Sequence, residues 1–109
     1  MTKMHVTTFA IAAAACTLLG TPAVSMAVDG APLAAKYNCT ACHAIDKKLV
    51  GPSFKDVAAK YAGNAGALVK LEHSVKAGST GVWGAMPMPP NNVPDADLKP
   101  LVEWILAAK

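Results

Sequence analysis

The chain has 109 residues and a mass of 11.2 kDa, which allows one small domain and excludes an enzyme with a cleft between two domains. Its formal net charge is +3, and all ten cations are lysine. Nucleic-acid readers favour arginine guanidinium contacts and clustered basic charge. A nucleic-acid ligand is therefore not expected.

Residues 1–27 are interpreted as an export signal that is removed. Lys3 gives them a basic start, and the apolar run over 6–20 is too short to span a membrane. Small side chains at Ser25 and Ala27 favour signal-peptidase cleavage after Ala27. A lipid-attachment site at Cys16 is the alternative, but the usual leucine is absent. Removing 27 residues leaves 28–109, which are 82 residues with a net charge of +2 because Lys3 is lost.

The mature chain is expected to begin with a helix that leads into two cysteines. Pro32 suits a first helical turn, Asp29 is a candidate cap, and the helix runs through Tyr37. The stretch 44–52 shows no helical period and closes with a turn at Gly51-Pro52.

The cysteine motif lies between these two segments. A chain of 82 residues has a marginal core, and a disulfide between Cys39 and Cys42 would close too small a loop to stabilise it much. Cys39-Thr40-Ala41-Cys42-His43 is instead the C-x-x-C-H pattern of haem attachment. Both thiols can add to the vinyl groups of one haem c, and His43 can supply an axial nitrogen.

Two other kinds of site are alternatives for these cysteines. A thioredoxin-like redox pair requires strands in a βαβ context, which the sequence does not show. A zinc site requires further ligands, and only His73 remains outside the motif.

Three more helices are expected. Ser53 is a candidate N-cap for a helix that ends at Gly63, and Asn64 is a candidate cap for the next, which ends at Gly78. Their apolar positions repeat at helical spacing: Phe54, Val57, Ala58 and Tyr61 in one, Leu68, Leu71 and Val75 in the other.

A proline-rich loop over 79–94 precedes the last helix. That helix has Asp95 and Asp97 in its first turn and an apolar side of Leu98, Leu101, Val102 and Ile105. Pro100 lacks an amide hydrogen, so a kink or a delayed helix start near Lys99 is expected. No useful stretch alternates with period two, and the fold class is predicted to be all-α.

The sixth iron ligand decides between an electron carrier, an oxygen binder and a catalyst. Met86, Met88 and His73 are the candidates in the mature chain. Met88 is preferred because Pro87 and Pro89-Pro90 restrict its backbone. Met86 reads as a flexible apolar side chain, and His73 lies among charged residues on a solvated helix face.

The mature chain resembles a small monohaem bacterial class I cytochrome c over all of residues 28–109. The resemblance is carried by the cysteine motif, by Val50-Gly51-Pro52 with 54–58, by Gly81-Val82-Trp83-Gly84, and by Met88-Pro89-Pro90-Asn91. It implies one domain of about four helices around one covalent haem. It also implies a periplasmic carrier between respiratory complexes, such as a cytochrome bc-type complex, and a cytochrome cd-type nitrite reductase or terminal oxidase.

The resemblance further implies roles for three residues. Pro52 would accept a hydrogen bond from Nδ1 of His43, Trp83 would donate to a haem propionate, and Asn91 would place its amide near the Met88 sulfur. Two positions depart from the family. Ser74 stands where many relatives have a cation or imidazole that meets a propionate. Relatives also tend to have an aromatic residue near the position of Ala34, where the first and last helices cross. Here Ala34 would face Leu101, and Tyr61 or Trp104 would fill the space that the aromatic side chain leaves.

Ligation by both His43 and Met88 would leave no open position on the iron, so one-electron transport is expected and enzymatic catalysis is not. The alternatives are a haem enzyme or gas sensor with a labile Met88, and a non-haem thiol carrier. A soluble monomer is expected, with redox partners meeting an exposed haem edge. The predicted apolar rim of this edge is Thr40, Leu49, Val50, Ala85, Met86, Pro87, Pro89 and Pro90, with Lys47, Lys48, Lys60 and Lys76 outside it.

Overall fold

The computed structural model describes residues 12–17, 19–21 and 29–109. Within them lie four α-helices, α1 (Ala31–Lys36), α2 (Phe54–Tyr61), α3 (Ala67–Ala77) and α4 (Asp95–Leu106), and the 3-10 helix η1 (Cys39–Ala41). These residues form no β-strand, which confirms the all-α prediction. The expected cleavage site after Ala27 lies outside the described residues. None of the described helices is long and apolar enough to cross a bilayer.

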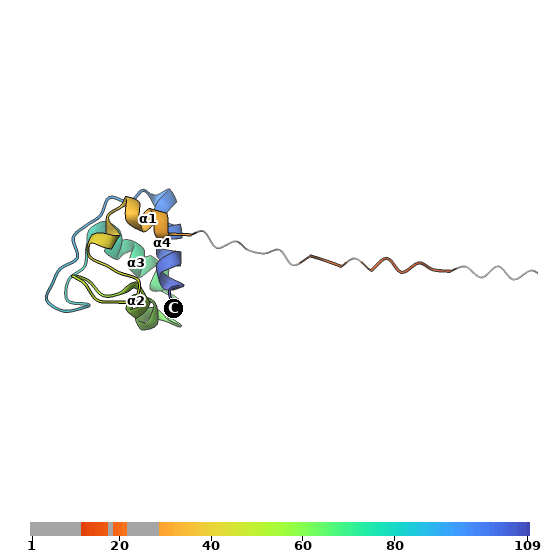
Figure 1. Ribbon diagram of the computed structural model, residues 1–109, viewed down its shortest axis with the longest axis horizontal. Coiled ribbons are helices and arrows are strands. Elements are labelled where there is room, and N and C mark those ends of the chain that lie inside the picture. The colour runs from red at the N-terminus through yellow and green to blue at the C-terminus, as the bar shows by residue number, and fades with distance from the viewer. Residues whose placement is uncertain (1–11, 18, 22–28) are drawn as a thin grey trace, which may run out of the picture.

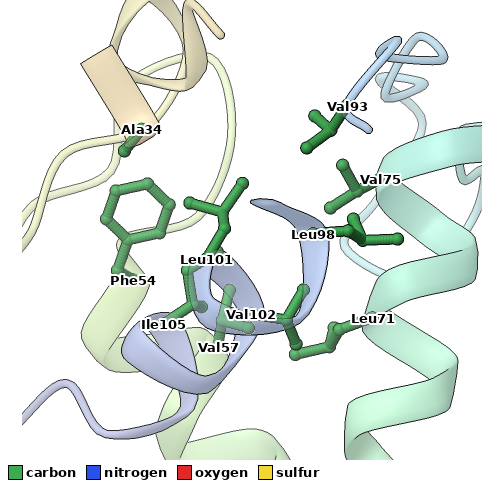
Figure 2. Close-up of a cluster of buried hydrophobic side chains, with 10 residues drawn as sticks. All are labelled: Ala34, Phe54, Val57, Leu71, Val75, Val93, Leu98, Leu101, Val102 and Ile105. Carbon is green, nitrogen blue, oxygen red and sulfur yellow. The ribbon is translucent and has the colours of Figure 1, made fainter. Parts of the chain in front are cut away.

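The core is built around α4, which contacts α1, α2 and α3. Figure 2 shows Leu101 and Val102 of α4 between side chains of α2 and side chains of α3, and both are fully buried. The two long connections, 42–53 and 78–94, run to the left of the helices in Figure 1. The cysteine motif lies on η1 and at the start of the first connection, and the methionine motif lies on the second.

The helix ends confirm one predicted cap and correct another. Ser53 caps α2, because its Oγ accepts a hydrogen bond from the amide of Asp56 at 3.0 Å. Asn64 does not cap α3, whose N-cap is Gly66. The side-chain oxygen of Asn64 instead accepts a hydrogen bond from the backbone amide of Gly66 at 2.9 Å. This bond closes a turn that precedes the helix, which begins at Ala67.

Pro100 lies inside α4, and the predicted delayed start near Lys99 is wrong. The helix begins at Asp95, five residues before the proline. Only the hydrogen bond to the Ala96 carbonyl is lost there, and Ala96 is exposed, so water can satisfy it. The buried apolar side predicted for this helix, Leu98, Leu101, Val102 and Ile105, is confirmed.

The crossing of α1 and α4 depends on small residues. Ala34 and Leu101 are both fully buried, as expected for a close helix contact without an aromatic side chain. Trp104 fills the neighbouring space: a Cβ on Gly30 would lie 2.4 Å from Trp104 Cβ. Asp29 accepts a hydrogen bond from the amide of Ala31 at 3.0 Å, although the N-cap position itself is Gly30.

A second link between these helices is polar. The Tyr37 hydroxyl donates to Asp97 Oδ2 at 2.5 Å, and the Lys36 ammonium lies 3.5 Å from the same oxygen. The hydrogen bond from Tyr37 is the main reason that the pKa of Asp97 lies below its ordinary value of 3.8. A carboxylate with a lowered pKa in the folded state stabilises the protein above its unfolded pKa, and this contribution is lost as the pH falls through the folded pKa.

Replacing Tyr37 with phenylalanine should therefore destabilise the protein at pH 7, and the difference from wild type should largely disappear near pH 2. Urea unfolding at both pH values measures this. The matched control is Asp97→Asn, in which the Tyr37→Phe replacement should lose most of its effect because the charged acceptor is gone. A Tyr37→Phe effect of equal size at both pH values would show that the carboxylate is not its cause.

Candidate functional site

A cavity of about 470 Å³ opens between the helices and the two loops. This volume is in the range of sites that hold organic cofactors. Its wall carries both cysteines of the motif, His43 and Met88, and its apolar part includes side chains from α2, α3 and α4: Phe54, Val57, Leu71, Val75 and Ile105. The structure thus brings together four chemically distinctive side chains that are separated by up to 49 positions in the sequence.

The cysteines lie on and just after the single turn of η1. Cys39 is its first residue and Cys42 its C-cap, so the three-residue spacing places both thiols on the cavity wall. Burial raises the pKa of the Cys39 thiol above its ordinary value. A redox-active thiol is usually kept as a thiolate by a lowered pKa, so this environment disfavours the thiol-carrier alternative.

The zinc alternative is also disfavoured. Across the parts of the chain that are described, no three side chains of histidine, cysteine or carboxylate type are gathered as a metal site. His73, the further zinc ligand considered, lies exposed on α3 and does not line the cavity.

The His43 ring is fixed by three neighbours. Its Nδ1 lies 2.7 Å from the carbonyl oxygen of Pro52, and because that oxygen can only accept, Nδ1 carries the proton. This leaves the lone pair on Nε2 free for a metal. The Phe54 ring stacks at 5.3 Å between centroids and 20° between planes. The backbone of Gly51 also approaches closely: a Cβ there would lie 2.5 Å from His43 Cε1.

Alanine at Gly51 should force the His43 ring or its loop to move. Overpacking of this kind costs about 1–3 kcal/mol of stability. Urea unfolding of Gly51→Ala measures the loss. Gly66→Ala is the control, because a Cβ at Gly66 would lie no closer than 3.5 Å to any atom outside its immediate neighbours. Equal stability of Gly51→Ala and wild type would contradict the close contact.

The structure separates the two candidate methionines. Met88 is half-buried and packs against the hydrophobic core. Met86 also borders the cavity, but its side chain is 67% exposed. The geometry therefore favours Met88 over Met86 as the side chain presented from the protein interior.

Of the remaining predicted site residues, Pro52 and Trp83 border the cavity, whereas Asn91 is not part of its wall. Trp83 is 40% exposed, with Lys60 Nζ 5.0 Å from its ring centroid. Asn91 donates its side-chain amide to the Pro89 carbonyl at 3.0 Å. Ser74 borders the cavity, and its hydroxyl donates to the Lys70 carbonyl. Ser74 thus offers the cavity no cation.

The sequence does not predict the role of two glycines of the site. The sequence predicts only a turn at Gly51 and a helix end at Gly78, whereas in the structure neither position has room for a Cβ beside the candidate ligand. The stacking of Phe54 on His43 was also missed, because Phe54 was assigned only to the core. A glycine next to a special residue is the available signal, and it becomes specific only when the backbone path is known.

Comparison with known proteins decides the family. The sequence profile of the family described as Cytochrome c matches residues 27–109. The chain belongs to the cytochrome c family. Its relatives include cytochrome c-551 of Azotobacter vinelandii, 61% identical over 71 residues, which are 65% of this chain and 87% of that protein. Cytochrome c-552 of Nitrosomonas europaea is 56% identical over 80 residues, which are 72% of this chain and 78% of that protein.

Solved structures show the same likeness. The crystal structure of wild-type Nitrosomonas europaea cytochrome c552 matches with a TM-score of 0.70 and 56% identity, covering 72% of this chain and 99% of that one. Class 1 cytochrome MtoD from Sideroxydans lithotrophicus ES-1 matches with a TM-score of 0.63 and 36% identity, covering 73% of this chain and 92% of that one. The fold is therefore that of the small class I cytochromes c.

This cytochrome carries one covalent c-type haem, attached through Cys39 and Cys42, and it is an electron carrier and not an enzyme. The residues present fit that group. The cavity has an apolar wall, two thiols on one turn, an imidazole with a free Nε2 lone pair and a thioether. When bound, the haem supplies a one-electron couple between ferrous and ferric iron.

Proposed function

We propose that this cytochrome is a periplasmic one-electron carrier in which His43 and Met88 are the axial ligands. Residues 1–27 would be the export signal, and the mature chain 28–109 would act as a monomer between a respiratory complex, such as a cytochrome bc-type complex, and a nitrite reductase or terminal oxidase. The observation that carries the proposal is that His43 and Met88 share one cavity with both cysteines. With two ligands bound the iron has no open site, so electron exchange is the chemistry left to it.

Contacts within the protein hold both proposed ligands in place. The Pro52 carbonyl orients the imidazole and strengthens it as a donor, because it accepts the proton on the other ring nitrogen. The Met88 amide donates to the Ser79 carbonyl at 2.8 Å, and the Ser79 amide donates to the Met88 carbonyl at 3.0 Å. Neither residue therefore has much conformational freedom to lose on ligation, and little movement is needed when the iron changes oxidation state.

Two further contacts belong to this proposal. Trp83 would donate its indole hydrogen to a haem propionate, since it borders the cavity. Asn91 would adjust the electron density of the Met88 sulfur through its amide, which at present donates to the Pro89 carbonyl of the same segment. Both roles remain predictions.

The surface that would meet redox partners is an apolar rim, and five of the eight residues predicted for it border the cavity: Val50, Ala85, Met86, Pro87 and Pro89. All eight residues predicted for this rim are exposed, among them Leu49, Val50 and Met86 at 44%, 54% and 67%. Of the four lysines predicted around the rim, Lys60 lies over the Trp83 ring and Lys76 pairs with Asp95. Lys47 and Lys48 are therefore the main candidates to attract an acidic partner.

Raising the ionic strength should slow electron delivery to an acidic partner, because salt screens exposed charges. Stopped-flow measurement of the bimolecular rate at several salt concentrations checks this. The double replacement Lys47→Gln and Lys48→Gln should remove most of the salt dependence, whereas Lys99→Gln should not, since Lys99 lies on α4 with Glu103 at 3.8 Å. A rate that is constant from low to high salt would exclude steering by these lysines.

The mass and visible spectrum of the mature protein test the proposed function. The mass should equal that of residues 28–109 plus one haem, and the ferric spectrum should be six-coordinate and low-spin with a methionine-to-iron charge-transfer band. Rapid binding of carbon monoxide by the native ferrous protein would instead support a haem enzyme or gas sensor with a labile Met88.

A further inference from the structure

The segment that carries Met88 is attached to the C-terminal end of α3 at two points. Ser79 and Met88 exchange two backbone hydrogen bonds as an isolated antiparallel pair. Three residues after Met88, the backbone amide of Asn91 donates to the Val75 carbonyl at 2.8 Å. Val75 is a buried residue of α3, so residues 88–91 lie along the end of a helix that is itself anchored in the core.

Gly78 lies between these two attachment points. Its backbone has φ 81° and ψ 174°, a region that is essentially restricted to glycine. A Cβ at this position would lie 2.7 Å from the Met88 carbonyl oxygen and 3.2 Å from both Pro90 Cδ and Pro90 N. The obstacle is backbone and a proline ring, which cannot move aside as the end of a flexible side chain could.

We propose that Gly78 is a positioning residue for the axial methionine: because it has no side chain, the end of α3 can approach residues 88–91 closely enough to hold the Met88 backbone in place. The inference rests on the proposed ligation by Met88. Residues 88–91 are attached to the C-terminal end of α3 by the two hydrogen bonds between Ser79 and Met88 and by the hydrogen bond from the Asn91 backbone amide to the Val75 carbonyl. A side chain at position 78 would push the Met88 backbone away from the helix and disrupt the pair with Ser79.

Imidazole binding to the ferric holoprotein measures how firmly Met88 is held, because imidazole occupies the sixth position only when the sulfur leaves. Gly78→Ala should bind imidazole about tenfold more tightly than wild type, since release of Met88 would relieve the close contact and the strained backbone. Its methionine-to-iron charge-transfer band should also be weakened at neutral pH while the protein stays folded by far-UV circular dichroism.

Gly63→Ala is the matched control. Gly63 also has a left-handed φ, 74°, but a Cβ there would meet nothing within 4 Å. The variant should lower the stability through the backbone while leaving the imidazole affinity and the charge-transfer band unchanged. Equal tightening in both variants would assign the effect to general loosening and overturn the proposal, as would an unchanged affinity in Gly78→Ala.

Two measurements on the wild-type protein complete the test: amide hydrogen exchange and the visible spectrum. If Gly78→Ala does not fold, amide hydrogen exchange of the wild-type holoprotein decides. The amides of Ser79, Met88 and Asn91 should then exchange at least about tenfold more slowly than those of the exposed residues Val82 and Ala85. Fast exchange at Ser79 and Met88 would show that the end of α3 does not hold the Met88 segment, and would overturn the proposal. A wild-type spectrum without the charge-transfer band would refute the ligation by Met88 itself, so the two failures can be told apart.

Discussion

Replacing Met88 with alanine should abolish the methionine-to-iron charge-transfer band and lower the reduction potential by roughly a few hundred millivolts, within the range that axial ligands control. A thioether is a soft ligand that stabilises ferrous iron relative to ferric iron. Water or an external ligand in its place would favour the ferric state. The visible spectrum and a redox titration of the mature variant measure both effects.

Met86→Ala is the control for this result. Met86 is two residues away, borders the same cavity and has the same side chain, but that side chain is mostly exposed. Its replacement should leave the band in place and change the potential by much less. The opposite pattern, with the band lost in Met86→Ala and kept in Met88→Ala, would show that the wrong sulfur was assigned.

The difference between the two methionines follows from the backbone. Met88 is fixed on both sides by its pair with Ser79, and its side chain packs against the core. Met86 lies in the exposed stretch 80–87 between the two members of that pair. A ligand from a fixed segment loses little entropy on binding, whereas one from an exposed loop must first be ordered.

Local signals in the sequence predicted all four helices, although the cap of α3 and the start of α4 differ from the prediction. A serine just before an apolar helical repeat is a favourable N-cap, because its hydroxyl can accept a hydrogen bond from an amide of the first turn. The structure confirms this role for Ser53. The buried side of α4 followed from the spacing of Leu98, Leu101, Val102 and Ile105. These features depend on a few neighbouring residues, so no knowledge of the tertiary structure was needed.

Where the sequence prediction failed, neighbouring contacts had decided the outcome. Pro100 was expected to delay α4, but the packing of the helix on three others outweighs one lost hydrogen bond at an exposed carbonyl. The close approaches of Gly51 to His43 and of Gly78 to Met88 join segments whose relative position is set by the whole chain. Sequence spacing does not encode such distances, so only the structure shows that both candidate ligands rest against a glycine.

Replacing both Cys39 and Cys42 with alanine should leave the mature chain largely unfolded, because the haem would no longer be retained. Without it, the cavity of about 470 Å³ in the centre of the fold would expose its apolar wall. Exposing this apolar surface to water removes a large part of the hydrophobic stabilisation that the folded chain has when the haem covers it. A domain of this size has only about 5–15 kcal/mol of stability.

Far-UV circular dichroism and urea unfolding of the double variant measure this loss directly. Thr40→Ala is the control, because Thr40 lies between the two cysteines, is exposed and does not line the cavity, so its replacement should not affect haem attachment or folding. The single replacements should be intermediate, since one thioether bond still prevents the haem from dissociating. A helical, cooperatively unfolding double variant without haem would contradict the argument, because it would show that α1, α2, α3 and α4 hold their arrangement through the core around Leu101 and Val102 alone.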